Sequence, residues 1–248
     1  MKNIINYILI GIIQGLTEFL PISSSGHIVL FGSLFELDNL LLLSVVAHIG
    51  TLFAVVYCYR KRIWNLVTHP KNKTNLNLVI ATVPSVIIVL LFNSFLEDNF
   101  SSSSLVWGFL ISAVLLLVAD LIKHGDKPIT KKSALYMGIS QGFALLPGIS
   151  RSGTTLVVGL FSKVEKSEAL DFSFLMSIPI IIASAIYESF KLLTCQLTVN
   201  WIGSFIVMLT SFIFGIISIK LMLKVVKTNK LFYFSIYLII LSLVVLLF

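Results

Sequence analysis

The chain is poor in charged residues. Only 12% of its 248 residues are Asp, Glu, Lys or Arg, whereas 57% are hydrophobic. A soluble domain carries about 25% charged residues, so this deficit excludes an ordinary soluble protein and indicates an integral membrane protein. Acidic residues are the scarcest, 11 against 18 Lys and Arg, which gives a net charge of +7. In a membrane protein such an excess reflects basic cytoplasmic loops. We therefore expect the bilayer, and no nucleic acid, as a partner.

Cysteine is almost lacking, since only Cys58 and Cys195 are present. Two cysteines without metal-ligand spacing define neither a disulfide framework nor a metal site, so we expect both to be apolar filler. A cleaved secretory signal is not expected either. Gln14, Glu18 and Pro21 interrupt the first apolar segment, and no small-residue cleavage site is evident.

Six segments are apolar and long enough to cross a bilayer as helices of about 20 residues. They are residues 40–59, 76–96, 105–122, 169–192, 199–223 and 231–248. Two other regions, 4–35 and 133–162, each contain a helical arm, a turn rich in Pro, Ser and Gly, and a shorter arm. Irregular backbone is tolerated at membrane depth only where protein or a water-filled cavity covers it. We therefore expect both regions to be re-entrant helical hairpins.

One sequence pattern occurs twice at a constant offset of 127 residues. Residues 11–26 read GIIQGLTEFLPISSSG, and residues 138–153 read GISQGFALLPGISRSG. Three predicted spans separate the two hairpins, and because three is odd the hairpins enter from opposite sides. The sequence therefore predicts an all-α polytopic membrane domain with an inverted-topology repeat. The first unit covers about 1–122 and the second about 128–248.

The basic residues predict the orientation of the chain. They gather in the loops at 60–73, 123–132, 163–166 and 220–230, which share one side if six segments cross the membrane. The positive-inside rule makes that side cytoplasmic and places both termini outside. The opposite side has Glu97, Asp98 and a run of serines, with few cations.

The first copy of the pattern contains a carboxylate at membrane depth, Glu18. Such a group is a functional-site hypothesis by default. Gln14 precedes it by four residues and shares its helix face. Gly11 and Gly15, and likewise Gly138 and Gly142, have the spacing that lets helices approach closely.

The two turns contain the other candidate residues. The first reads Ser23-Ser24-Ser25-Gly26-His27 and the second Ser150-Arg151-Ser152-Gly153. A helix amino end favours an anion, and the planar guanidinium of arginine suits phosphate oxygens. Ser23 and Ser150 have the alternative role of helix caps.

The repeat makes Ser24 and Arg151 equivalent positions. Equivalent turns near a pseudo-two-fold axis meet at the membrane midplane, so the two hairpins should bring their polar residues together. We expect Glu18, Ser24 and His27 to face Arg151 and Thr155. This set suffices for phosphoryl transfer, with His27 as acid, base or nucleophile.

Other polar residues are weaker candidates. His48 and Asp171 lie inside predicted spans and are candidates for a supporting role near the site. Glu188 lies near a span end, where we expect it to snorkel or to be exposed. His69 and His124 lie in basic loops and are expected to have no catalytic role.

The two motifs, GIIQGLTEFLPISSSGH and LLPGISRSGTT, resemble the signatures of the bacterial undecaprenyl-diphosphate phosphatase (bacitracin-resistance protein) family. Residues 171–179 (DFSFLMSIP) resemble the family's following segment. The resemblance implies hydrolysis of undecaprenyl diphosphate to undecaprenyl phosphate, which recycles the lipid carrier of peptidoglycan synthesis and confers bacitracin resistance. It also implies a bacterial cytoplasmic membrane location, with an active site facing the external side.

The resemblance further implies roles for individual residues. It implies catalytic roles for Glu18, Ser24, His27 and Arg151, and a divalent cation, Mg or Ca, with Glu18 as its ligand. It implies substrate-binding roles for Gln14, Ser23, Ser25, Gly26, Ser150, Ser152, Gly153 and Thr155. Gln14 departs from the family motif, which usually has two glutamates four residues apart; a neutral amide is a poorer metal ligand and no base.

Two other classes of function remain alternatives at this stage. Inverted repeats with broken helices are also transporter architecture, so a lipid-phosphate transporter or flippase is the main rival. A structural membrane subunit is disfavoured by Glu18 and Arg151. Oligomeric state is open, with a homodimer among the options.

Overall fold

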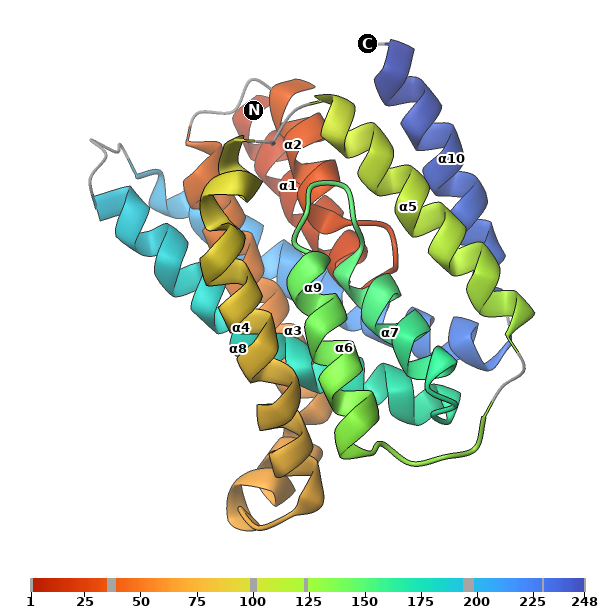
Figure 1. The fold of residues 1–248 in the computed structure, drawn as a ribbon. Helices are drawn as coiled ribbons and strands as arrows, with labels where there is room; N and C mark the ends of the chain where they lie inside the picture. Colours follow the sequence, from red (N-terminus) through yellow and green to blue (C-terminus); the bar gives the residue numbers. More distant parts are fainter. Residues whose placement is uncertain are drawn as a thin grey trace.

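The computed structural model describes residues 2–34, 39–98, 102–122, 125–193, 199–228 and 230–247. Within these residues the chain is all-helical, and its only extended pairing is an isolated bridge between Lys127 and Val164. Cys195 and His124 lie outside the described residues. The helices in chain order are α1 (Lys2–Phe19), α2 (Ser24–Leu34), α3 (Leu40–Thr68), α4 (Lys73–Asp98), α5 (Ser102–Leu121), α6 (Lys131–Phe143), α7 (Arg151–Phe161), α8 (Lys166–Leu193), α9 (Trp201–Lys227) and α10 (Phe232–Leu247) (Figure 1).

Five of these helices are long and apolar enough to cross a membrane: α3, α4, α5, α8 and α9. They correspond to five of the six predicted spans, which confirms a polytopic membrane protein. The sixth predicted span forms α10, an apolar helix of 16 residues that is shorter than the others. Prolines lie inside two long helices, Pro84 in α4 and Pro179 in α8.

The two predicted hairpins are the helix pairs α1–α2 and α6–α7, and the two helices of each pair contact one another. The offset of 127 residues maps all of α2 onto all of α7, since Ser24–Leu34 becomes Arg151–Phe161. Each longer arm packs against a helix of the other half of the chain, α1 against α9 and α6 against α4. The halves are therefore interlocked.

Glycines permit this close packing of the longer arms. A Cβ atom at Gly15 would lie 2.7 Å from the carbonyl oxygen of Ser211 in α9, and one at Gly142 would lie 2.8 Å from Cβ of Ile88 in α4. Both distances are too short for a side chain. The predicted role of these glycines in close helix approach is confirmed.

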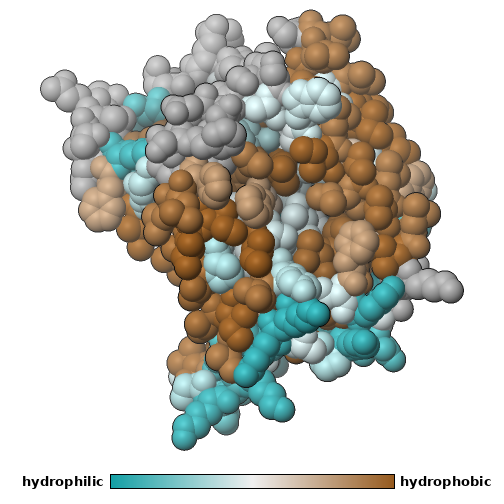
Figure 2. Space-filling view, viewed as in Figure 1, coloured by the Kyte–Doolittle hydropathy of each residue, from teal (hydrophilic) through white to brown (hydrophobic). Residues whose placement is uncertain are grey.

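Polar and apolar surfaces are separated along the molecule. Figure 2 shows a broad hydrophobic surface with strongly hydrophilic side chains at its lower end. In Figure 1 that end contains the connection between α3 and α4 and the amino end of α6, whereas both chain termini lie at the opposite end. Basic loops and termini therefore lie at opposite ends, as the lysine and arginine pattern predicts.

Candidate active site

Glu18 is the centre of the polar cluster between the two hairpins. It lies in the last turn of α1, and its side chain is only 3% exposed. The amide nitrogen of Gln14 donates a hydrogen bond of 2.9 Å to Glu18 Oε2, and the hydroxyl of Ser24 donates one of 2.6 Å to the same oxygen. A buried carboxylate needs such donors, because burial without partners destabilises a charge strongly.

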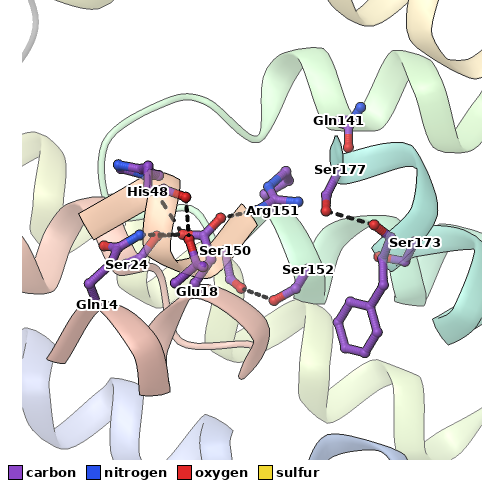
Figure 3. A network of polar contacts seen from close by, with 12 residues as sticks. Gln14, Glu18, Ser24, His48, Gln141, Ser150, Arg151, Ser152, Ser173 and Ser177 are labelled. Atoms are coloured by element: carbon purple, nitrogen blue, oxygen red, sulfur yellow. Dashed lines mark hydrogen bonds and ion pairs between the residues drawn. The ribbon is translucent and has the colours of Figure 1, made fainter. Parts of the chain in front are cut away.

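Arg151 reaches Glu18 from the second hairpin. Its guanidinium donates to Glu18 Oε1 and forms an ion pair with the carboxylate. Figure 3 shows Gln14 and Ser24 on one side of Glu18 and Arg151 on the other. The structure thus brings Glu18, Ser24 and Arg151 together, as the repeat argument predicts.

The amino ends of two helices meet at this cluster. Ser24 is the first residue of α2 and Arg151 the first residue of α7. The first backbone N–H groups of a helix have no partner within it, and the helix dipole adds partial positive charge. Two such ends beside a guanidinium form a strongly anion-attracting environment.

His48 of α3 also faces Glu18. Its Nε2 atom lies 3.8 Å from Glu18 Oε2, and its Nδ1 atom lies 2.8 Å from the carbonyl oxygen of Ser44. Glu188 of α8 is half-buried and close enough to interact electrostatically with both His48 and Glu18. Its proximity to the site was not predicted.

Asp171, the other candidate inside a span, lies elsewhere. It accepts hydrogen bonds from the Tyr59 hydroxyl at 2.6 Å and from the Arg62 guanidinium at 2.7 Å. This network links α3 to α8 and has no contact with Glu18 among those that the structure describes. The described contacts of Asp171 therefore join α3 to α8 and lie apart from the Glu18 cluster.

His27 does not join the cluster, in contrast to the expectation. Its Nδ1 atom lies 2.7 Å from the carbonyl oxygen of Ser23, and its Nε2 atom lies 2.7 Å from the hydroxyl of Tyr237 in α10. The ring is buried between aromatic side chains, with Phe109 of α5 against its edge. The i, i+3 spacing places His27 on the same helix face as Ser24, but its contacts with the Ser23 carbonyl and the Tyr237 hydroxyl direct the ring toward α10, with Phe109 of α5 beside it.

Two serines of the turns, Ser23 and Ser150, cap the helices that follow. Ser23 Oγ accepts from the backbone N–H of Gly26, and Ser150 Oγ accepts from that of Gly153. Ser25 interacts with the Ser23 hydroxyl. The alternative role of Ser23 and Ser150 as helix caps is the one that the structure shows.

The remaining predicted binding residues pack the two hairpins together. Ser152 donates to the Leu20 carbonyl, and Gly153 lies against Pro21. Thr155 interacts with the hydroxyl of Ser173 in α8 and with the Arg151 and Ser152 carbonyls, and none of its described contacts is with Glu18 or Ser24. Thr155 therefore does not meet Ser24, contrary to the prediction.

The cluster contains few metal ligands. The described residues contain no group of three or more His, Cys, Asp or Glu side chains placed to hold an ion. Oxygen atoms near the site that could bind an ion belong to Glu18, Ser24, Glu188 and the buried Gln14, whose Oε1 has no hydrogen-bond partner among the described residues. These fit an ion held mostly by ligand phosphates, as is common for Mg²⁺, rather than a cage made by protein alone.

Together these features define a class of protein. A buried carboxylate that binds a hydroxyl and a guanidinium, inside a bundle of long apolar helices, is typical of a polytopic membrane protein that acts on an anionic ligand. Comparison with known proteins narrows this class. The chain belongs to the bacitracin resistance protein BacA family, whose model matches residues 7–244.

Curated relatives cover nearly the whole chain. Undecaprenyl-diphosphatase 3 of Bacillus cereus is 40% identical over 241 residues, which is 95% of this chain and 93% of the relative. The undecaprenyl-diphosphatase of Carboxydothermus hydrogenoformans is 36% identical over 256 residues, with 98% and 97% covered. That of Methanococcus maripaludis is 38% identical over 251 residues, with 97% and 98% covered.

Proposed function

We propose that this protein is an integral-membrane phosphatase that hydrolyses undecaprenyl diphosphate to undecaprenyl phosphate and inorganic phosphate. One observation supports this above all: the Ser24 hydroxyl donates to Glu18 at 2.6 Å while Arg151 binds the other carboxylate oxygen. A nucleophile, a base and a phosphate-binding cation thus lie within one contact of each other. The names of the relatives give the same activity.

In the proposed reaction, Ser24 Oγ attacks the terminal phosphorus of the substrate, and its proton passes to Glu18 Oε2. The bond between this phosphorus and the bridging oxygen breaks, and undecaprenyl phosphate leaves with the electron pair. Glu18 passes this proton to the departing undecaprenyl phosphate and is again a carboxylate. Water then attacks the phosphoserine, and Glu18 takes a proton from the water and gives it to Ser24 Oγ as the bond between phosphorus and Oγ breaks, so that inorganic phosphate forms and Ser24 is regenerated. His27 is not the nucleophile in this scheme, because both of its ring nitrogens are engaged elsewhere.

Arg151 and the two helix ends stabilise charge during this transfer. Phosphoryl transfer depends mostly on positioning and on neutralising the equatorial oxygens. The guanidinium is suited to bind two phosphate oxygens at once. A divalent cation, Mg or Ca, would be held by Glu18 and the substrate phosphates, and would add positive charge at the same oxygens.

The proposed architecture has six crossings and two re-entrant hairpins related by an inverted repeat, with units at about 1–122 and 128–248. The matching bounds of α2 and α7 and the crossed packing of α1 and α6 support it. The proposed location is the bacterial cytoplasmic membrane, with the Glu18 cluster reached from the external side. We also propose that the protein forms a homodimer.

Release of inorganic phosphate tests the activity. Purified protein in detergent, given undecaprenyl diphosphate, should release phosphate, and Ser24→Ala and Arg151→Ala should each reduce kcat/KM by about 100-fold or more. Arg151→Lys should recover only part of the loss, because an ammonium lacks the planar fork. Ser162→Ala, at the other end of α7 from Arg151, where the hydroxyl donates to the Val158 carbonyl, is the control and should stay within about threefold.

Two outcomes would contradict the proposal. Wild-type protein that moves lipid phosphates across vesicles without releasing phosphate would be a transporter. A phosphoenzyme trapped on His27, with Ser24→Ala still active, would assign the nucleophile to the imidazole. A phosphoenzyme mapped to Ser24 supports the scheme.

A further inference from the structure

His27 has two partners that together determine its protonation pattern. Its Nδ1 atom lies 2.7 Å from the Ser23 carbonyl oxygen, and its Nε2 atom lies 2.7 Å from the Tyr237 hydroxyl. A carbonyl oxygen only accepts hydrogen bonds, so Nδ1 carries a hydrogen. In the neutral ring Nε2 is then an acceptor, and Tyr237 donates its O–H to it.

Aromatic side chains enclose the ring on several sides. Tyr237 stacks on it at 5.7 Å between ring centroids with an interplanar angle of 11°, and Phe31 stacks at 6.4 Å. Phe109 meets its edge at 5.9 Å. His27 is 2% exposed, so its orientation is fixed by packing as well as by the two hydrogen bonds.

Ser23, the other partner of His27, has an unusual backbone. Its φ angle is 68°, in the left-handed region that a residue with a side chain rarely adopts. Its carbonyl oxygen accepts from both the backbone N–H of His27, at 3.3 Å, and the ring Nδ1. Such a conformation persists only where its surroundings hold it. The next residue is Ser24, whose hydroxyl lies on Glu18.

We propose that Tyr237 is a positioning residue for the reaction: its hydroxyl holds His27 in the Nδ1–H form, and His27 in turn holds the left-handed Ser23 that presents Ser24 to Glu18. The role in turnover rests on the proposed function, whereas the hydrogen-bond pattern does not. The last helix of the chain, α10, thereby completes a site formed by the first hairpin.

Nitrogen chemical shifts of the imidazole test the hydrogen-bond pattern without any enzyme assay. In wild-type protein labelled with ¹⁵N-histidine and placed in lipid bilayers, the His27 signal, identified by its loss in His27→Asn, should show a protonated Nδ1 and an unprotonated Nε2. Tyr237→Phe removes only the hydroxyl and should shift the Nε2 resonance or convert the ring to the Nε2–H form. Tyr233→Phe, one turn earlier in α10 and 57% exposed, is the matched control and should leave the spectrum unchanged.

Kinetics test the positioning role. Tyr237→Phe should lower kcat about fivefold to tenfold, the effect of one lost hydrogen bond, with KM changed less than about twofold. Tyr233→Phe should have wild-type kinetics. In His27→Asn the shorter amide side chain still has a donor for the Ser23 carbonyl but does not reach Tyr237. Adding Tyr237→Phe to His27→Asn should therefore cause no further loss of kcat.

The two measurements separate the inference from the proposed function. An Nε2–H tautomer in wild-type protein would overturn the hydrogen-bond pattern and with it the inference. Wild-type phosphate release that Tyr237→Phe leaves unchanged would overturn the positioning role. Absence of phosphate release from wild-type protein would overturn the proposed function and the positioning role, whereas the tautomer would still establish or refute the Tyr237 contact.

Discussion

At the residue scale, the site depends on how a membrane-buried carboxylate is stabilised. Glu18 has four polar neighbours, the Gln14 amide, the Ser24 hydroxyl, the Arg151 guanidinium and, at 3.8 Å, the His48 imidazole. The amide and the hydroxyl are neutral, so the permanent charge of Arg151 compensates the carboxylate directly. Removing one partner of a buried ion pair destabilises a protein by about 3–5 kcal/mol. Loss of Arg151 alone would therefore destabilise the folded hairpins, because it would leave Glu18 as an uncompensated buried charge.

The position of Gln14 gives a test of how much charge the site tolerates. Gln14→Glu should keep activity within about tenfold, because a protonated carboxyl can still donate to Glu18 when two acids share a site. Glu18→Gln should lose about 100-fold or more, since it removes the base and the partner of Arg151. Phosphate release measured across the two variants decides between these effects. Equal losses would mean that the Gln14 amide itself makes an essential contact.

The sequence predicts these residues unequally. Glu18, Ser24 and Arg151 could be placed together because the repeat relates Ser24 to Arg151 and because charge is rare at membrane depth. The direction of His27 could not be predicted, since it depends on Tyr237, which lies 210 residues away. Tyr237 has no counterpart in the repeated motif and lies in a helix with few polar residues. The one sequence feature that indicates a hydrogen-bond partner for Tyr237 is the presence of its hydroxyl in an apolar segment.

At the element scale, close helix contacts determine where the two hairpins sit. The longer arms α1 and α6 approach α9 and α4 through glycines, and this was predictable from the spacing of those glycines. The crossed pairing itself could not be predicted, because an apolar helix presents several equivalent faces to its neighbours. Among the predicted spans, α10 is the shortest, and its packing against α5 also has no signal in the sequence.

Gly15→Ala tests the contact between α1 and α9. The added methyl group would lie 2.7 Å from the Ser211 carbonyl oxygen and 2.8 Å from Phe214 Cβ, so the helices must separate. Overpacking of this kind destabilises by about 1–3 kcal/mol. Thermal unfolding in detergent should show a midpoint lower by about 2–4 °C for each kcal/mol. Ile5→Ala, at an exposed position of the same helix, is the control, and equal midpoints for the two variants would argue against a tight α1–α9 contact.

At the scale of the whole molecule, the repeat and the distribution of charge make one joint prediction. The termini lie at the end opposite the α3–α4 connection (Figure 1). The loops at the end with the α3–α4 connection are rich in Lys and Arg. If the first hairpin is re-entrant, six crossings put both termini outside. If α1 and α2 instead crossed the bilayer completely, the amino terminus would be cytoplasmic. The two hairpins would then no longer be oppositely oriented.

Accessibility of single cysteines in intact cells distinguishes these topologies. The background for labelling lacks Cys58 and Cys195, and the single cysteines replace Asn3, Lys71, Ser102 and Lys227. An impermeant thiol reagent should label positions 3 and 102 in intact cells. Positions 71 and 227 should react only after the membrane is opened, because basic loops remain on the cytoplasmic side. Labelling at 102 without labelling at 3 would indicate seven crossings, and the inverted repeat would then no longer explain why Ser24 and Arg151 meet at Glu18.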